Sequence, residues 1–179
     1  IAYEQNDLDA VVPLAEQSYK LALRLSNIHT PISSYLVLAR YHLAKGELTM
    51  TDEVITKAEA FADQNHFPQR IPEITTYRID LLLKRGDIDQ ANSLAEAHQL
   101  PISLARIRIE QGKYHDALTF VQSHRKVKET KEEIRPFLQA LVIESLCYFY
   151  LKEPQKASMI LKRALTKAKA GGFVRLFLD

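Results

Sequence analysis

The sequence predicts an all-α protein in which about five antiparallel helix hairpins stack side by side as a solenoid. The first observation is a repeated phrase, Leu-Ala-Arg-x-x-[Leu/Ile]-x-x-Gly, at residues 38–46 and again at residues 104–112. The second is that each copy ends in a glycine turn and is followed by a further helical pattern. The third is that apolar residues recur every three or four positions, without the alternation of a strand. An internal repeat of this kind is typical of stacked hairpins.

Hairpin turns are predicted near residues 6, 46, 86, 112 and 152. Three of them are marked by glycine, one by Asn6, and the weakest by the segment 152–154. In the first four, an apolar residue follows two positions after the turn former. Successive turns are separated by 40, 40, 26 and 40 residues, which indicates loops of variable length on a constant hairpin plan.

The helices between these turns are assigned from the apolar periodicity. Pro31, Pro72 and Pro101 lie where helices are expected to begin, because the first turn of a helix tolerates a missing backbone donor. Thr130 and Glu133 are expected to form a capping box ahead of one of them. The predicted helices are 8–26, 33–45, 49–64, 72–85, 87–97, 101–111, 113–124, 132–151, 154–169 and the start of another at 173.

Small residues explain how the hairpins stack closely. Ala91, Ala117 and Ala157 occupy one equivalent position, each five residues after its turn. A larger side chain there would separate two helices whose axes otherwise approach to about 8–10 Å. The position is therefore predicted to be buried.

Composition predicts a folded, soluble chain and excludes several classes of protein. The 24 Lys and Arg residues nearly balance the 22 Asp and Glu residues, so the net charge of +2 does not by itself indicate a polyanion-binding surface. Cys147 is the single cysteine, which favours a reducing compartment and hence a cytoplasmic location. No apolar run approaches the roughly 18–20 residues that a membrane-spanning helix needs.

The chain is expected to be one helical-repeat domain over residues 1–179 that has been cut from a longer protein at both ends. It opens at Ile1 without a signal peptide and closes inside the apolar segment 173–178. Terminal hairpins expose faces that a neighbouring repeat would cover, so self-association through these faces is expected.

Two basic stretches have alternative interpretations. Residues 124–128 with Lys131 are interrupted by glutamates, and a solvated loop is the expected structure. The later set is more purely basic and is interpreted either as an exposed helix face or as a source of nonspecific phosphate contacts. It consists of Lys162, Arg163, Lys167, Lys169 and Arg175.

The sequence lacks the common motifs for nucleotide binding, metal binding and catalysis. It contains no Gly-x-x-x-x-Gly-Lys-[Ser/Thr] loop to cradle the phosphates of a nucleotide. No two of the six histidines are spaced at i, i+4, and no cysteine pair offers thiolate ligands. Carboxylate pairs such as Asp7 with Asp9 and Glu132 with Glu133 lie in turns or helix starts, where the helix dipole favours them. The chain is therefore expected to be noncatalytic, with no metal and no cofactor.

Two sets of motifs resemble a known family. The spacing in Gly86-Asp87-Ile88-x-x-Ala91 and Gly112-Lys113-Tyr114-x-x-Ala117 resembles the tetratricopeptide (TPR) consensus. The C-terminal third, from Phe137 through Arg163-Ala164-Leu165 to the segment 171–179, resembles the end of the TPR-like domain in MalT-type regulators of the LuxR family. Two departures are the turn at 152–154, which lacks the usual glycine, and Arg78-Ile79-Asp80, which replaces Leu-Ala-Arg.

The resemblance implies a right-handed superhelical sensor domain of a bacterial transcription regulator. It also implies that an ATP-binding switch and a C-terminal helix-turn-helix lie outside this chain, so that ATP and nucleic acid would bind there. A noncatalytic domain that binds a small-molecule inducer or a regulatory protein in its groove, and that activates DNA binding by the full-length protein, is then expected. The alternative is a TPR scaffold for a constitutive peptide or protein partner.

In TPR superhelices the residue six positions before each turn faces the concave groove, which gives three polar candidates here. They are Arg40, Asp80 and Arg106, and they would present alternating charge to a peptide or polar ligand. The alternative is a ladder of intramolecular ion pairs between neighbouring hairpins. Several apolar residues are expected to line or support the same groove, although a role in the core between stacked helices would also explain them. They are Leu36, Leu83, Ile102, Ile109, Val142 and Phe149.

Overall fold

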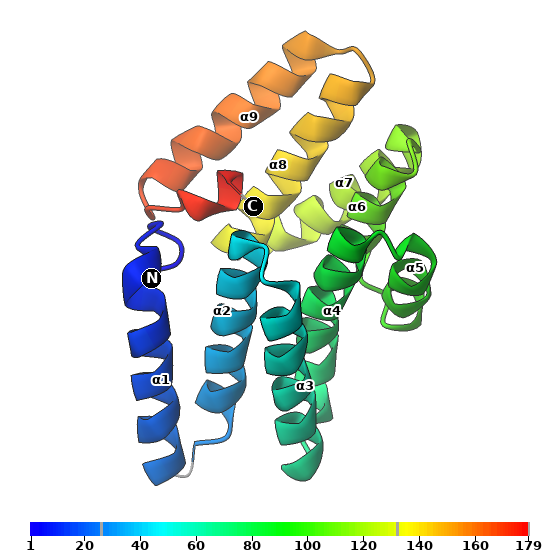
Figure 1. The fold of residues 1–179 in the computed structure, drawn as a ribbon. Coiled ribbons are helices and arrows are strands. Elements are labelled where there is room, and N and C mark those ends of the chain that lie inside the picture. The colour runs from blue at the N-terminus through cyan, green and yellow to red at the C-terminus, as the bar shows by residue number, and fades with distance from the viewer. Residues whose placement is uncertain (26, 132, 179) are drawn as a thin grey trace. The chain divides into compact units, whose positions relative to one another are not determined.

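The computed structural model describes residues 1–25, 27–131 and 133–178, and the regular structure in these ranges is helical (Figure 1). The described residues form two compact units, Ile1–His98 and Gln99–Asp179. Within each unit, consecutive helices pack as antiparallel hairpins. The predicted fold class, an all-α TPR-like solenoid of helix hairpins, is confirmed.

The described part of the first unit, residues 1–25 and 27–98, contains five α-helices. They are α1 (Leu8–Arg24), α2 (His29–Lys45), α3 (Leu48–Gln64), α4 (Ile71–Arg85) and α5 (Ile88–Ala97), with a short 3-10 helix at Pro68–Arg70 before α4. Each helix packs on the next along the chain, and α2 also contacts α4. The first helices of two neighbouring hairpins therefore lie side by side.

The second unit repeats this plan with four α-helices in the ranges 99–131 and 133–178. They are α6 (Pro101–Glu110), α7 (Tyr114–Thr130), α8 (Ile134–Tyr150) and α9 (Pro154–Lys169), followed by a 3-10 helix at Arg175–Phe177. Consecutive helices pack on one another, and α6 also contacts α8. As in the first unit, the first helices of adjacent hairpins are neighbours.

All five turn positions have the same backbone geometry. The φ angles are positive at Asn6 (63°), Gly46 (74°), Gly86 (81°), Gly112 (72°) and Lys152 (63°). At Gly46 the amide donates to the carbonyl of Leu43, and the next amide, of Glu47, donates to the carbonyl of His42. The other four turns have the same two hydrogen bonds. This is the Schellman motif, which satisfies the last carbonyls of one helix and turns the chain into the next.

The position five residues after each turn is buried, as predicted for the three alanines. Ala91 and Ala117 are fully buried and Ala157 is 7% exposed. Val11 and Thr51 hold the same position after the first two turns and are also buried. The hairpins pack around this series of small and medium side chains.

Four local predictions were wrong, three of them on the bounds or type of an element. Helix α2 begins at His29 rather than residue 33, because the side chain of Asn27 accepts from the amides of His29 and Thr30. Helix α7 continues to Thr130, so residues 124–128 are helical and not a loop. The segment after 173 forms a 3-10 helix instead of an α-helix.

The predicted capping box of Thr130 and Glu133 is also wrong, because Thr130 belongs to the end of α7 and does not precede the next helix. Thr130 is the last residue of α7, and its hydroxyl donates back to the carbonyl of Lys126. The carboxylate of Glu133 accepts from Lys128 Nζ at 2.6 Å instead of capping a backbone amide. Ser26, Glu132 and Asp179, which also figured in the predictions, lie outside the described residues.

Candidate functional site

The predicted groove positions fall on the first helix of each hairpin. Arg40 lies on α2 and Asp80 on α4, two helices that contact each other in the first unit. Arg106 lies on α6 of the second unit, and counting six residues back from the turn at Lys152 gives Leu146 on α8 as its counterpart. Helices α6 and α8 also contact each other. Each unit thus brings two equivalent positions onto neighbouring helices.

Arg40 is held by the segment that precedes α1. Its Nη1 donates to Glu4 Oε1 at 2.8 Å, and its guanidinium lies 4.1 Å from the ring centroid of Tyr3. The Tyr3 hydroxyl donates to the Arg40 carbonyl. Burial lowers the pKa of Arg40, whereas Tyr77, Glu4 and Tyr3 together raise it by more, so the pKa lies above its ordinary value. These contacts attach Arg40 of α2 to the segment before α1, within the first unit.

The other candidates of the first unit differ in exposure. Asp80 and Leu83 are half-buried on α4. Leu36 is only 3% exposed and belongs to the core of the unit, among Ile32, Val54 and Ile74. Its side chain supports α2 from within and leaves almost no surface for a ligand.

The groove positions of the second unit form a more apolar surface. Arg106 is half-buried, and Ile109 packs against the core cluster around Val121. On the neighbouring helix α8, Leu146 is 43% exposed and Phe149 is 61% exposed. Phe149 stands three residues before its turn, as Ile109 does on α6. Two large apolar side chains are therefore open to solvent at positions equivalent to Arg106 and Ile109.

Aromatic rings extend this surface at the end of α8. The rings of Tyr114 and Tyr150 are stacked, with centroids 4.9 Å apart and planes inclined by 9°. Phe149 meets Tyr150 edge to face at 5.6 Å. Exposed aromatic rings supply contact area with little loss of side-chain entropy, which suits them to binding.

The residue Arg78, treated in the sequence only as a departure from the repeat, is the centre of an ion-pair cluster on α3 and α4. It donates to Glu59 through Nε (3.2 Å) and Nη2 (2.7 Å), and it also pairs with Asp52. Arg85 contacts the second oxygen of Asp52 at 2.8 Å. Asp52 and Glu59 are seven residues apart, and this spacing, which places two carboxylates on one helix face, is the signal that predicts the cluster.

A second cluster, also missed from the sequence, joins α7 to α8. Glu144, whose side chain is 3% exposed, lies with Oε2 at 2.7 Å from Nε of Arg125. Gln122 donates to Glu144 Oε1 at 3.1 Å and to the Tyr148 hydroxyl at 3.2 Å. A lone carboxylate in the apolar sequence of α8 is the signal that could have indicated it.

The described ranges present an exposed apolar surface on α8 and two ion-pair clusters. Among the described residues, no three His, Cys, Asp or Glu side chains gather where they could hold a metal ion. Within the same ranges, no helix is long and apolar enough to cross a membrane. The Arg78 cluster joins α3 to α4 and is partly open to solvent, whereas the Arg125–Glu144 pair joins α7 to α8 and is largely buried. The exposed surface on α6 and α8 is therefore the candidate for a functional site.

Comparison with known protein families gives one finding. Residues 1–179 match the MalT-like TPR region. A search of curated proteins found no match. The family match covers both units, so the whole sequence corresponds to one family region.

Proposed function

Because the chain belongs to the MalT-like TPR family, we propose that it is the signal-sensing domain of a MalT-type transcription regulator of the LuxR family. In this proposal an inducer or a regulatory protein binds the groove-facing side of the hairpins and activates DNA binding by the full-length protein. The domain is noncatalytic. ATP and DNA are bound by other parts of a longer, cytoplasmic bacterial protein.

The observation that carries the proposal is the exposure of Leu146 and Phe149 at groove positions of α8. Leucine and phenylalanine side chains of a helix normally pack into the core, because removing their large apolar surface from water is favourable. Their exposure on one face supports a surface that is covered when a ligand binds.

The polar candidates have different roles in this proposal. Arg106 is the directional group beside the apolar surface, since its guanidinium offers several donors at fixed angles. Ile109 supports the same surface, and Asp80 with Leu83 forms the equivalent position of the first unit. Arg40 is assigned to the ladder between hairpins, because Glu4 and Tyr3 already occupy its guanidinium.

Binding alone does not make a sensor. A ligand shifts a protein between two states only if its affinity for the two states differs, and the same coupling must operate in both directions. In the full-length protein, ligand and DNA binding are therefore expected to strengthen each other.

The test is a thermal-shift screen of the chain against sugars, metabolites and short peptides, with each hit measured by calorimetry. Arg106→Ala and Phe149→Ala are compared with Val127→Ala, which truncates an exposed apolar residue of the same unit away from the groove positions. Loss of binding of at least tenfold in the first two variants but not in the third is expected. Melting curves of the variants confirm that they are folded.

Two outcomes contradict the proposal. A ligand that binds equally well to all three variants would reject the groove assignment. A stable peptide or protein partner, recovered from pull-downs regardless of small molecules, would favour the scaffold function instead.

A further inference from the structure

The two units of the chain carry opposite charge. Residues 1–98 contain 9 Lys and Arg against 14 Asp and Glu, a net charge of −5, whereas residues 99–179 contain 15 against 8, a net charge of +7. The net charge of +2 for the whole chain is the remainder of these two values. The second unit is therefore expected to attract acidic partners, and the first unit basic ones.

The positive charge of the second unit is concentrated on α9. This helix contains Lys156, Lys162, Arg163, Lys167 and Lys169 and no acidic residue. Three of the five are engaged within the unit: Lys156 pairs with Glu153, Arg163 pairs with Glu129, and Lys167 lies over the ring of Phe137. Lys162 and Lys169 are exposed and form no ion pair with any residue in the described part of the chain.

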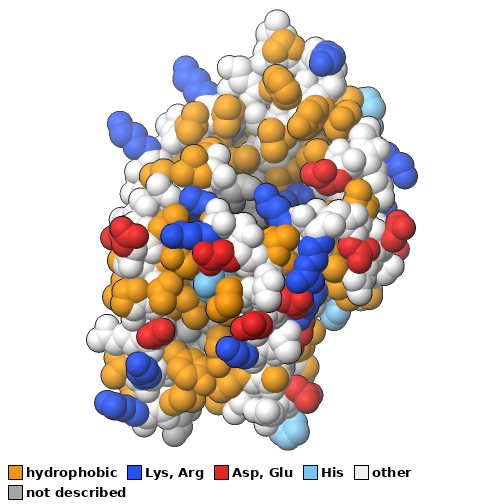
Figure 2. Space-filling view, viewed as in Figure 1, with side chains coloured by type: hydrophobic (Ala, Val, Ile, Leu, Met, Phe, Trp, Pro, Cys, Tyr) orange, Lys and Arg blue, Asp and Glu red, His pale blue; other side chains and the backbone are white. Residues whose placement is uncertain are grey.

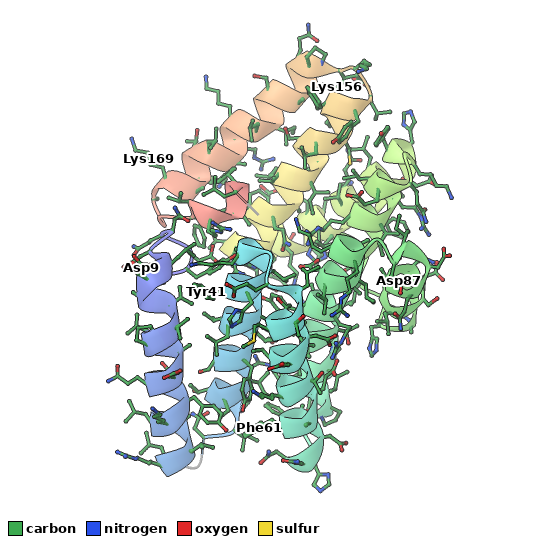
Figure 3. All side chains as sticks on the ribbon, in the orientation of Figure 1. Asp9, Tyr41, Phe61, Asp87, Lys156 and Lys169 are labelled. Carbon is green, nitrogen blue, oxygen red and sulfur yellow. The ribbon has the colours of Figure 1, made fainter. Side chains whose placement is uncertain are left out.

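Exposed apolar side chains alternate with these two lysines. Met159 is 63% exposed and Leu165 is 49% exposed, and each lies three residues from Lys162. Leu165 also lies four residues before Lys169, so all of these side chains are neighbours on one helix surface. Figure 2 shows basic side chains projecting from this region with hydrophobic ones between them, and Figure 3 shows Lys169 directed away from the helix.

The opposite side of α9 is already used for folding. Ala157, Ile160, Ala164 and Ala168 are buried there against α8. The outer surface of Met159, Lys162, Leu165 and Lys169, which we call the α9 outer face, is therefore separate from the groove positions on α6 and α8.

We propose that the α9 outer face docks an acidic amphipathic helix of a partner protein. Such a helix places carboxylates against Lys162 and Lys169 and buries its own apolar stripe against Met159 and Leu165. Docking a helix by apolar anchors three or four residues apart, with charges at the edges, is a recurring mode of recognition. Lysine charges with no ion pair in the described residues raise the association rate of an acidic partner and select against basic ones.

Other occupants fit the same surface less well. The phosphates of a nucleic acid would pair with the lysines but leave Met159 and Leu165 in water. A bilayer requires a broad apolar face, whereas polar Gln155, Ser158 and Thr166 interrupt this one. A second copy offers the acidic helix α5, but its apolar residues Ala91 and Ala95 are already buried.

The experiment measures fluorescence anisotropy of a labelled acidic amphipathic peptide of about 18 residues, or five helical turns, with leucine on one face and glutamate on the flanks. Binding to the whole chain is expected, and it should weaken as salt screens the charges. The variant Lys162→Glu/Lys169→Glu is expected to lose at least tenfold in affinity, and Leu165→Ser severalfold. The control Lys20→Glu/Lys57→Glu makes the same charge change on exposed lysines of the first unit and should bind better than the α9 variant.

Several outcomes would overturn the proposal. They are an absence of peptide binding, an equal loss in the control variant, and peptide binding that Leu165→Ser leaves unchanged. Tighter binding of duplex DNA or of anionic vesicles than of the peptide would assign the surface to those partners instead. A concentration-dependent dimer that Leu165→Ser abolishes would assign it to a second copy.

Discussion

Arg125 of α7 and Glu144 of α8 form an ion pair, with 2.7 Å between Nε and Oε2. The Glu144 side chain is 3% exposed and that of Arg125 is 17% exposed, so the pair is largely removed from water. A charge in that environment is tolerated only while its partner is present. Together with the hydrogen bonds of Gln122 to Glu144 and Tyr148, the pair fixes the register of two helices that also share apolar contacts.

Removing Arg125 alone is expected to be strongly destabilising. Arg125→Met leaves the carboxylate of Glu144 buried without its counterion and should lower the free energy of unfolding by about 3 kcal/mol. The double variant Arg125→Met/Glu144→Leu should recover most of this loss, because no buried charge remains. Urea denaturation of Arg125→Met, Glu144→Leu and the double variant measures the coupling energy between the two side chains.

The matched control for this cycle is the half-buried pair Lys128–Glu133, whose side chains are 22% and 39% exposed. Because both side chains are more open to solvent, Lys128→Met should cost less than about 1 kcal/mol. Equal losses in Arg125→Met and Lys128→Met would contradict the special role given to the buried pair.

Gly112 and Lys152 have the same positive φ, so substitutions at these two turns should change stability in opposite directions. A Cβ at Gly112 meets no atom within 4 Å, but φ there is +72°, so Gly112→Ala should cost about 1 kcal/mol through backbone strain alone. Lys152 already bears that strain at φ 63°, and Lys152→Gly should stabilise the chain by up to about 1 kcal/mol. Thermal melts of both variants check the signs. A stabilised Gly112→Ala variant would refute this explanation of the turn glycines.

Enlarging a small residue between two helices should be destabilising. Ala117 is fully buried, and Ala117→Leu is expected to cost about 1–3 kcal/mol by overpacking. Thr119→Leu, at an exposed position of the same helix, should change stability by less than about 0.5 kcal/mol. Melting temperatures separate the two, and an unchanged value for Ala117→Leu would remove the close-packing argument.

The cluster around Asp52 predicts a dependence of stability on pH. The hydrogen bonds of Arg85 and Arg78 hold the pKa of Asp52 below its ordinary value of 3.8. A carboxyl group with a lowered pKa in the folded state contributes stability above its unfolded pKa and loses it as pH falls through the folded pKa. The free energy of unfolding of the wild type should exceed that of Asp52→Asn by a constant amount from neutral pH to about pH 5, and the difference should shrink below pH 4. Urea denaturation at a series of pH values measures this difference.

The control for this titration is Glu53→Gln, which removes a neighbouring carboxylate that is exposed on the same helix. Its stability difference from the wild type should stay small at every pH. An Asp52→Asn difference that did not change down to pH 3 would show that the ionised form is not favoured by folding.

Cys147 is expected to be unreactive in the folded chain. Burial raises the pKa of its thiol to about 11, and the neighbouring Glu144 adds to the shift. Little thiolate is then present at pH 8, and the side chain is fully buried. Alkylation by iodoacetamide should be slow in buffer and fast in urea; equal rates would mean that α8 opens readily.

The repeat plan was determined by the sequence alone, because it depends on local chemistry. Positive φ at Gly46, Gly86 and Gly112 follows from the residue type, and the boundaries of 154–169 agree with α9 to the residue. Apolar spacing and turn formers act within a few residues of each other, so they can be read without knowing what the chain packs against.

The ends of helices depended on contacts far along the chain. Helix α7 extends through 125–130, where Arg125 pairs with Glu144 and Glu129 with Arg163, the latter 34 residues away. Local apolar spacing does not reveal partners so distant in the sequence, and it therefore predicts a loop at 124–128. Arg40 is a similar case, since its partner Glu4 lies 36 residues away.

The exposure of apolar side chains and the distribution of charge between the two units were decided by tertiary structure. The sequence placed Leu36 and Phe149 together as residues that line or support the groove, but burial determined that Leu36 belongs to the core while Phe149 and Leu146 face solvent. A net charge of +2 suggested no preference for a charged partner, and only the division into two units separated it into −5 and +7. Burial and charge separation are properties of which residues become neighbours, and that is set by packing and not by order along the chain.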